Sequence, residues 1–541
     1  MGRHIAALVV ACATAHQTFA QHIHSERESV VVPMELLARP VTRREGIGTV
    51  HHAVSTGSPP AQRLYDHGLA YLHNYSWIEA ARAFNEALRL DPKLVPALVD
   101  LSIAYVQLNR PADAQRVLAA ASALSSDATP HERTHVVVRE RQVVAEAAPQ
   151  DVMKAAAYRR ALDDALRQFP SDVELLLLRG MAETRNPSDR GQSSTVSAIP
   201  FYQQALSAGS EHFGAHHYLA HAFENAGRTS EALKHGAAYA RLAPAIPHAR
   251  HMHGHALRRT GRVGEAVLEF EAADRLHTQY FAAERIPAEF DWHYAHNLDL
   301  LGTSFMYLGQ MRRAEQALER SFALPTSTLI QTFNKREWLL FLRGRGRNDE
   351  ARAAAAVLVS HANPVIRAAG RIESGHGHLI GKNFAQAAAD ANAAIAELRS
   401  AKVGAGLATI ALESLQGEFY LRAGPREKGR QLLEAVVDKA GAEQGPDEWA
   451  QALFTMELAA AAARDAGDWQ LAERLAAKML EHHPAYGGTH YALGLVAAQR
   501  GDQDAARSAF GRAQEYWRQA DADLKELQAV RAWLKTHARA R

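Results

Sequence analysis

The sequence predicts an all-α fold, an α-solenoid of stacked helix-turn-helix repeats. From Ala61 onward, small and large apolar residues recur with a period of 34 residues, and prolines recur near the ends of the units. A repeat of this length forms one helical hairpin, which cannot bury its apolar face alone, so neighbouring repeats must stack. The chain has 541 residues, 47% of them hydrophobic and 22% charged, which is enough for a long array.

The first repeat, which starts at Ala61, shows the pattern most clearly. Positions 4, 8, 11, 17, 20, 24, 27 and 32 are Leu64, Gly68, Tyr71, Trp77, Ala80, Phe84, Ala87 and Pro92. Small residues at positions 8, 20 and 27 let the paired helices approach closely, and large residues at positions 4, 11 and 24 fill the groove between them. The proline at position 32 ends the second helix.

The same frame returns in units from Val95, Phe213, Pro247, Ala295, Leu453 and Gly487, with looser units near Thr332, Arg367 and Ile410. It degrades between residues 125 and 210, where the polar insert 186–195 is expected to be a loop. The predicted organisation is therefore a signal peptide (1–20), an extended leader or linker (21–60), N-terminal repeats (61–126), degenerate repeats with an insert (127–212), histidine-rich repeats (213–328), C-terminal repeats (329–520) and a capping helix (521–541).

The first residues have the character of an export signal. A short basic start precedes an apolar run from Ile5 to Ala15, and Thr18 and Ala20 are small, as signal peptidase requires. We therefore expect a bacterial protein that is exported to the periplasm or secreted, with no transmembrane segment in the mature chain. The sole cysteine, Cys12, lies in this signal, so disulfides and thiolate metal ligands are not expected.

Bulk charge gives no indication of a nucleic-acid or membrane partner. Lys and Arg number 61 against 59 Asp and Glu, a net charge of +2. A nucleic-acid-binding protein is expected to carry a clear basic excess. No basic patch and no dinucleotide-binding fingerprint is present, so we expect neither nucleic acid nor a nucleotide cofactor.

The repeat pattern resembles that of the tetratricopeptide repeat family. This resemblance implies a right-handed superhelix in which each repeat pairs a helix A with an antiparallel helix B. It also implies a protein or peptide partner in the concave groove. In that family, positions 2, 5, 9 and 12 of helix A look out from the concave surface.

Histidines concentrate in the central repeats. Twelve of the 29 histidines lie between His212 and His296. In the units from Phe213 and Pro247, the histidines at positions 5 and 9 coincide, and each pair is spaced i, i+4, which places both rings on one face of a helix. Position 2 adds a histidine in the units from Pro247 and Ala295, position 12 adds a glutamate in the unit from Phe213, and position 5 adds an aspartate in the unit from Ala295. The candidate metal ligands are therefore His217, His221, His248, His251, His255, His296, Asp299 and Glu224.

On the family pattern, these side chains would share one groove, and helices about 8–10 Å apart can bring their rings to one ion. Nitrogen and oxygen donors without thiolate suit zinc, copper or iron. His216 and His253 fall at packing positions, and the remaining histidines, His293 among them, receive no role. An ordinary polar surface or a peptide-binding groove without metal remains the alternative interpretation.

A second resemblance covers most of residues 46–310. The segments HFGAHHYLAHAFE, PHARHMHGHALRRTGR and HYAHNLDLLG are similar to those of a group of exported bacterial repeat proteins with a His-Met-Pro-x-His motif. Here His253 replaces the proline of the motif, and Asp299 replaces a histidine. The resemblance supports treating the histidines as a set and implies no particular reaction.

Together these observations predict an exported scaffold that binds a protein or peptide and carries a histidine-rich metal site. The alternatives are a metal-dependent enzyme, a hydrolase or oxidoreductase, in which Glu224 or Asp299 serves as ligand or general base, and an interaction scaffold without metal.

Overall fold

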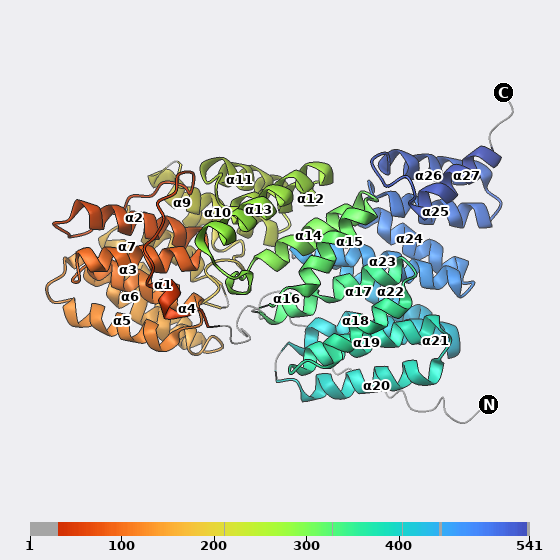
Figure 1. Ribbon diagram of the computed structural model, residues 1–541, viewed down its shortest axis with the longest axis horizontal. Helices are drawn as coiled ribbons and strands as arrows, with labels where there is room; N and C mark the ends of the chain where they lie inside the picture. Colours follow the sequence, from red (N-terminus) through yellow and green to blue (C-terminus); the bar gives the residue numbers. More distant parts are fainter. Residues whose placement is uncertain are drawn as a thin grey trace. The chain divides into compact units, whose positions relative to one another are not determined.

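The computed structural model describes residues 31–184, 186–209, 211–326, 328–402, 404–442 and 446–537, with the backbone alone for 446–449. The predicted signal peptide, which includes Cys12, lies outside these residues. All regular structure in the described ranges is helical, which confirms the predicted all-α class of stacked hairpins (Figure 1).

The chain forms two compact units. Among the described residues, the N-terminal unit comprises 31–260 and 268–294, and the C-terminal unit comprises 261–267 and 295–537. The helices of the N-terminal unit are α1 (Met34–Leu37), α2 (Pro59–His73), α3 (Trp77–Leu90), α4 (Val95–Gln107), α5 (Pro111–Leu124), α6 (Pro130–Glu146), α7 (Val152–Gln168), α8 (Val173–Met181), α9 (Ile199–Ala208), α10 (Phe213–Asn225), α11 (Thr229–Leu242), α12 (Pro247–Arg259), most of α13 (Val263–Glu284) and the short η3 (Ala288–Phe290).

The C-terminal unit continues the succession of hairpins. Its helices are α14 (Tyr294–Tyr307), α15 (Met311–Ala323), α16 (Leu329–Asn334), α17 (Arg336–Gly344), α18 (Asn348–Val359), α19 (Pro364–Ile380), α20 (Phe384–Ser400), η4 (Ala405–Ala408), α21 (Thr409–Ala423), α22 (Arg426–Ala442), α23 (Pro446–Asp465), α24 (Trp469–His482), α25 (Gly487–Gln499), α26 (Gln503–Tyr516) and α27 (Lys525–Thr536). The last of these occupies the stretch predicted as a capping helix.

In the hairpins of the repeats from Ala61, Pro247 and Gly487, a glycine at position 8 packs against an aromatic ring at position 24. A Cβ atom on Gly68 would come within 2.6 Å of the Phe84 ring, and one on Gly254 within 2.7 Å of Phe270. In the C-terminal unit, a Cβ atom on Gly494 would lie 2.4 Å from the ring of Phe510. Since real Cβ atoms do not approach so closely, glycine at position 8 is what lets the aromatic ring of helix B fill the groove.

The turn between the two helices of a repeat has a left-handed residue at position 15. Glycine supplies it at Gly227, Gly261, Gly467 and Gly501, where φ is 70°, 81°, 71° and 78°. Asn109 takes this place in the second repeat with φ 58°. The first repeat is different, because there Tyr75 adopts φ 57°.

The leader segment before α2 packs against the repeats of its own unit. Leu36, Leu37 and Ile47 are buried in its core. The Ile47 carbonyl accepts a hydrogen bond of 2.6 Å from the Asn74 side chain, and the Leu36 carbonyl accepts one of 2.9 Å from Arg82. The segment is irregular apart from α1, yet it is a fixed part of the fold.

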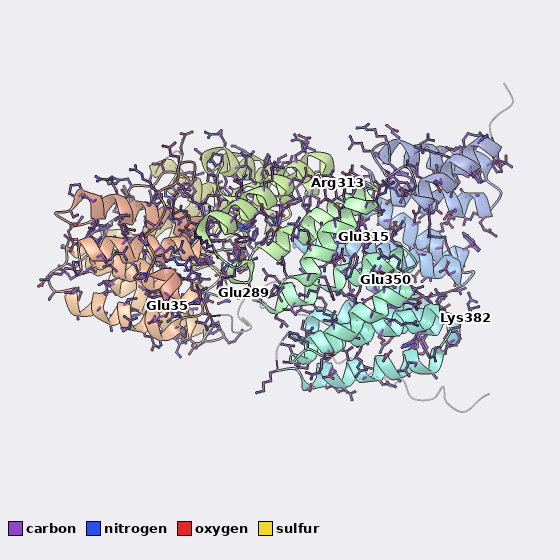
Figure 2. The ribbon with its side chains drawn as sticks, in the orientation of Figure 1. Glu35, Glu289, Arg313, Glu315, Glu350 and Lys382 are labelled. Carbon is purple, nitrogen blue, oxygen red and sulfur yellow. The ribbon has the colours of Figure 1, made fainter. Side chains whose placement is uncertain are left out.

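The outer faces of the hairpins carry charged side chains. Glu315 and Glu350 project from α15 and α18, and Arg347 bridges them, with 2.6 Å to Glu350 (Figure 2). Within the part of the chain that the structure describes, no helix is both long and apolar enough to cross a membrane.

A candidate histidine metal centre

Three of the predicted ligands converge in the N-terminal unit. His217 and His221 lie one turn apart on α10, and His248 lies at the start of α12. The Nε2 atom of His217 is 3.0 Å from Nε2 of His248 and 3.2 Å from Nε2 of His221. With metal–nitrogen bonds of 2.0–2.1 Å, two ligands of a tetrahedral ion lie about 3.3–3.4 Å apart. The three rings therefore almost have the spacing that a zinc ion requires.

The hydrogen bonds around the rings favour an ion between them. Nδ1 of His217 lies 2.7 Å from the carbonyl oxygen of His73, so this nitrogen carries the proton and donates it. In the neutral ring, Nε2 then has a single lone pair. Both His221 and His248 approach that lone pair, which can accept one hydrogen bond, whereas a metal ion would bind all three nitrogens.

Burial keeps these imidazoles in the form that binds metal. Burial, and after it the neighbouring His221, holds the pKa of His217 well below its usual value. The pKa of His248 is lowered in the same way, by burial first and then by His293 and His217. Both rings are therefore neutral near pH 7, as metal ligands must be.

The other predicted ligands of this unit lie beside the three converging rings. His255 pairs with Glu224, and His251 lies against His293, which is not among the predicted ligands. Nδ1 of His255 lies 3.3 Å from Oε2 of Glu224, an arrangement that directs Nε2 away from the carboxylate. Burial alone would raise the pKa of Glu224, but the adjacent His255, together with Arg259 and His221, outweighs burial and holds the pKa at about 2. The His251 ring lies 4.0 Å from the ring of His293, centre to centre. His296 and Asp299 belong to α14 in the C-terminal unit.

His293 is a residue that the repeat spacing does not identify. Its Nε2 lies 3.1 Å from Nδ1 of His248, so it holds that ring from the side opposite the three converging nitrogens. The segment around it is anchored because the Asp291 side chain accepts hydrogen bonds of 2.8 Å from the backbone N–H groups of His293 and Tyr294. The sequence signal is the dipeptide Trp292-His293 directly before α14, which lies outside the repeat frame.

The family pattern places these side chains on an open concave surface, and the structure corrects this expectation. His217, His248, His251, His255 and Glu224 are all buried. Residues from other repeats cover them, which the pattern of a single helix cannot reveal.

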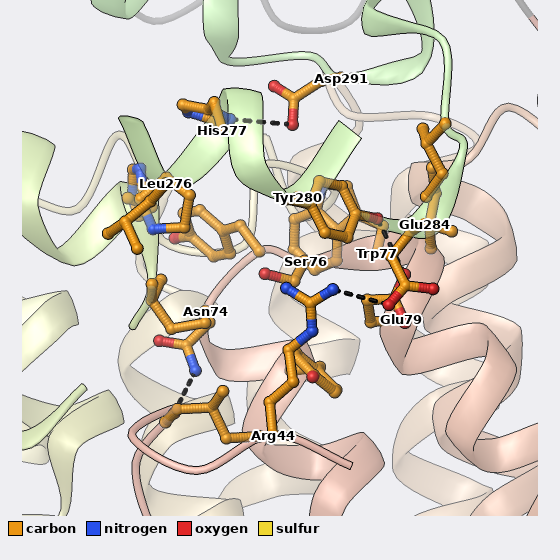
Figure 3. Close-up of a pocket in the computed structure, with 18 of the residues that line it drawn as sticks. Arg44, Asn74, Ser76, Trp77, Glu79, Leu276, His277, Tyr280, Glu284 and Asp291 are labelled. Atoms are coloured by element: carbon orange, nitrogen blue, oxygen red, sulfur yellow. Dashed lines mark hydrogen bonds and ion pairs between the residues drawn. The ribbon is translucent and has the colours of Figure 1, made fainter. Parts of the chain in front are cut away.

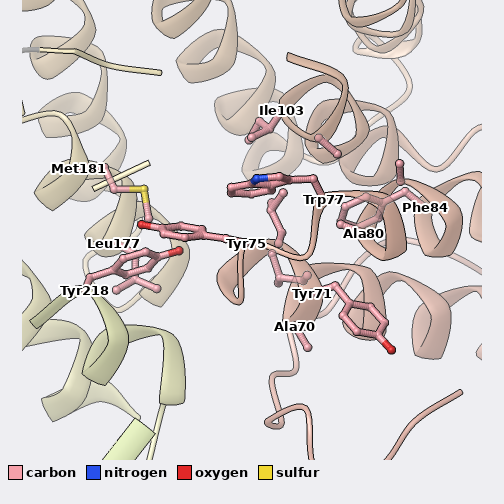
Figure 4. Close-up of a cluster of buried hydrophobic side chains, with 14 of the residues drawn as sticks. Ala70, Tyr71, Tyr75, Trp77, Ala80, Phe84, Ile103, Leu177, Met181 and Tyr218 are labelled. Atoms are coloured by element: carbon pink, nitrogen blue, oxygen red, sulfur yellow. The ribbon is translucent and has the colours of Figure 1, made fainter. Parts of the chain in front are cut away.

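The main cover is Tyr75, from the turn between α2 and α3. Its ring centre lies 4.5 Å from that of His217 and 5.2 Å from that of His248. Its hydroxyl donates to the Arg190 carbonyl at 2.6 Å, and Trp292 donates to its backbone carbonyl at 3.2 Å. Figure 4 shows Tyr75 and Trp77 in the same buried cluster as Tyr218 of α10.

Tyr75 covers the histidines with its backbone in a strained, left-handed conformation. A left-handed conformation is unfavourable for a bulky residue, and every other example at position 15 given above is glycine or asparagine. Strain of this kind persists where the surroundings require it, often at functional sites. A tyrosine at a position where the repeats named above have glycine or asparagine is therefore a sequence signal for the site.

A cavity of about 610 Å³ adjoins the cluster. Tyr75, His248, Trp292 and His293 line it on the side of the histidines. Figure 3 shows other parts of its lining, where Arg44 pairs with Glu284 at 2.6 Å and His277 pairs with Asp291 at 3.5 Å. The cavity is large enough for a small molecule.

The histidines at packing positions have separate partners. Nδ1 of His216 lies 2.9 Å from Nδ1 of His235, and Nδ1 of His253 lies 3.1 Å from Oε1 of Glu269. Neither residue contacts the three converging nitrogens, so both offer controls for the centre.

Comparison with known proteins confirms the predicted repeat over part of the chain. Residues 72–130 match the family model for the tetratricopeptide repeat. Among solved structures, the chain is similar to yeast Tom70 (13% identity, 88% of this chain and 95% of that chain, TM-score 0.33) and to the APC/C hetero-tetramer Cut9-Hcn1 (10% identity, 88% and 97%, TM-score 0.30). No curated protein matches the sequence. The likeness to exported bacterial repeat proteins stays a prediction.

Proposed function

We propose that this chain of tetratricopeptide repeats is an exported interaction scaffold whose N-terminal unit binds a divalent transition-metal ion through His217, His221 and His248. The observation that carries the proposal is the convergence of three Nε2 atoms at 3.0 and 3.2 Å from helices α10 and α12. Zinc is the first candidate, because three imidazoles are a common donor set for it, and copper and iron also accept nitrogen ligands.

The surroundings have the features of a metal site. The His73 carbonyl fixes the tautomer of His217, and His293 holds the other nitrogen of His248. Such contacts orient metal-binding histidines and commonly strengthen the site. Because the rings are buried under Tyr75 and Trp292, we expect the ion to join α10, α12 and the α2–α3 turn rather than to touch a bound peptide.

The scaffold role follows from the architecture. Stacked repeats offer long surfaces suited to protein partners. We expect the partner, a protein or peptide, to bind a surface of the array other than the buried histidine cluster. Export is proposed on the apolar run and the small residues of positions 1–20.

The second candidate is a metal-dependent enzyme, and the cavity beside His248 is the observation that favours it. Three histidines leave one position of a tetrahedral ion for water or substrate. The cavity of about 610 Å³, which His248 lines, provides space for a small molecule beside the cluster. His277, His293 and Asp291 line the same space and offer groups that can accept or donate a proton.

Elemental analysis of the protein, purified without a histidine tag and offered zinc, copper or iron, tests the metal centre. We expect the wild type to retain an ion that the variant His217→Ala/His248→Ala loses. His221→Ala, which removes a half-buried ring, should weaken zinc binding with less disturbance of the core. His216→Ala is the matched control, since it removes the neighbouring ring on the same helix without touching the cluster.

Retention of the same metal by the double variant would refute the centre. If the metal is present, cobalt-substituted protein distinguishes the two roles. A change in its visible absorption when azide or phosphate is added indicates an open coordination position and favours the enzyme. An unchanged spectrum favours the scaffold.

A further inference from the structure

We propose a second metal site in the N-terminal unit, in which His52, His131, His135 and Asp172 bind a zinc ion. These residues come from three separate segments: the leader, α6 and the loop before α8. Each offers one ligand atom, and the four atoms lie within 4.8 Å of one another. The site shares no residue with the centre of His217, His221 and His248.

The distances around Asp172 define the centre of the site. Its Oδ2 atom lies 2.5 Å from Nε2 of His131 and 3.0 Å from Nε2 of His135. Zinc bonds of 2.0–2.2 Å require ligand separations of about 3.4 Å in a tetrahedron. Both observed separations are shorter than this value by less than about 1 Å, so small side-chain rotations that move the donors apart would admit one ion.

Two local features of the sequence present the three donors of α6 and α8. His131 and His135 are spaced i, i+4 and therefore project from one face of the first turns of α6. Asp172 is the N-cap of α8, where its Oδ1 accepts a hydrogen bond of 3.0 Å from the backbone N–H of Leu175. The cap fixes the carboxylate and leaves Oδ2 directed at the two rings. Only 4% of the Asp172 side chain is exposed.

The leader holds the fourth donor in place through its backbone. The N–H of His52 donates to Asp66 at 3.2 Å, and its carbonyl accepts from Gln62 at 2.9 Å. Its ring centre lies 5.3 Å from those of His131 and His135. The neighbouring His51 is different, because its Nδ1 pairs with Asp66 at 2.7 Å.

Residues 131–135 read His-Glu-Arg-Thr-His, the H-E-x-x-H pattern in which two histidines of one helix bind zinc and the glutamate is a general base. The sequence interpretation missed this pattern. The structure supports the histidines and not the glutamate. Glu132 closes a capping box with Thr129 and accepts hydrogen bonds of 2.6–2.8 Å from Ser55. Its carboxylate is engaged at the helix start, so the pattern supplies ligands without the base.

The donor set indicates a structural role. Three histidines and one carboxylate fill the four positions of a tetrahedral zinc ion, which is typical of a closed site. An ion there would join the leader to α6 and α8, next to the contact of Ser55 with Glu132. A cavity of about 860 Å³, lined by His52, His131 and Asp172 among others, gives the ion access.

Zinc titration of the full chain against a chromophoric chelator tests the site, with Asp172→Asn as the main variant. Asparagine caps a helix as well as aspartate, so α8 keeps its start while the carboxylate ligand is lost. We expect this variant and His131→Ala/His135→Ala each to bind one zinc ion fewer per chain than the wild type. His51→Ala is the matched control and should bind as the wild type does.

The test also separates this site from the one proposed above. His217→Ala/His248→Ala should leave the zinc bound by His131, His135 and Asp172 unchanged, and combining the two sets of substitutions should remove both ions. If Asp172→Asn and His131→Ala/His135→Ala bind as much zinc as the wild type, the second site is refuted, and the cluster is a hydrogen-bonded group in which both imidazoles donate to Asp172.

Discussion

The repeats from Phe213 and Pro247 and the repeats from Leu453 and Gly487 have the same frame and different interiors. Both pairs start 34 residues apart. In the first pair, positions 5 and 9 are all histidine. In the second pair, position 5 is Glu457 or Tyr491, and position 9 is Ala461 or Leu495. Tyr491 and Leu495 pack against the apolar cluster around Trp517.

The two pairs show which positions of the repeat form the array of hairpins and which carry the histidines of the proposed metal site. All four repeats have a left-handed glycine at position 15, and the repeats from Pro247 and Gly487 share a glycine at position 8 that packs on a phenylalanine at position 24. Positions 5 and 9 are not needed for the hairpin, because apolar, acidic and histidine side chains all occur there. The side chains at positions 5 and 9 of helix A can therefore differ between repeats while the fold is kept.

Truncation of the position-24 rings should show that the frame is the same in both units. Phe270→Ala and Phe510→Ala each remove a buried ring that packs on a position-8 glycine, and each should destabilise its own unit by about 3–5 kcal/mol. Hydrogen exchange resolved along the chain measures the two effects separately. A large loss in only one unit would contradict the common frame.

Glu457 should make the stability of the C-terminal unit depend on pH. Burial raises its pKa to about 7, although the Tyr486 hydroxyl donates to both carboxylate oxygens at 3.0 Å. Because the folded pKa lies above the unfolded value of 4.5, the folded state binds more protons between these values. The free energy of unfolding should therefore fall as pH rises from 4.5 to 7, by at most about 3 kcal/mol.

Glu457→Gln should reduce the pH dependence of the free energy of unfolding between pH 4.5 and 7, as measured by urea unfolding at a series of pH values. His217, at the equivalent position of the repeat from Phe213, should respond in the opposite sense, because burial lowers its pKa and the folded state then binds fewer protons than the unfolded chain. An unchanged slope in Glu457→Gln would show that another group titrates.

The sequence predicts the local contacts within each repeat but not the contacts between distant repeats. The 34-residue period identifies the hairpins and the glycine contacts of position 8, since these are local. The register also places His217, His221 and His248 on related faces. The cover over them depends on Tyr75 and Trp292, whose proximity arises from the stacking of distant repeats.

For the cluster of His52, His131, His135 and Asp172, the sequence predicts one pair of residues and not the other two. The spacing of His131 and His135 is visible in the sequence as a helical pair, although the repeat frame is degenerate there. The pairing of these residues with His52 and Asp172 requires the path of the leader and the position of α8. No periodic pattern specifies these, because each is a single tertiary contact.

Added zinc should stabilise only the unit that carries the histidines. At a free concentration of 100 times Kd, one bound ion adds about 2.7 kcal/mol to the free energy of unfolding. Protection from hydrogen exchange should increase in α10 and α12 and stay constant in α23 to α26. His217→Ala/His248→Ala should abolish the increase in α10 and α12, whereas His216→Ala should preserve it. Equal protection in both units would indicate nonspecific binding.

The smallest expected effect tests the strain at position 15. Gly467 has φ 71°, and nothing lies within 4 Å of a Cβ atom built on it, so a substitution there reports the backbone conformation alone. Gly467→Tyr recreates the geometry of Tyr75 without histidine partners and should cost about 1–2 kcal/mol, while Gly467→Asn should cost less, because asparagine tolerates this region. Hydrogen exchange of α23 and α24 measures both. If Gly467→Tyr costs nothing, the tyrosine of the first repeat is no longer an indication of function, because its backbone conformation would need no compensation from the histidines it covers.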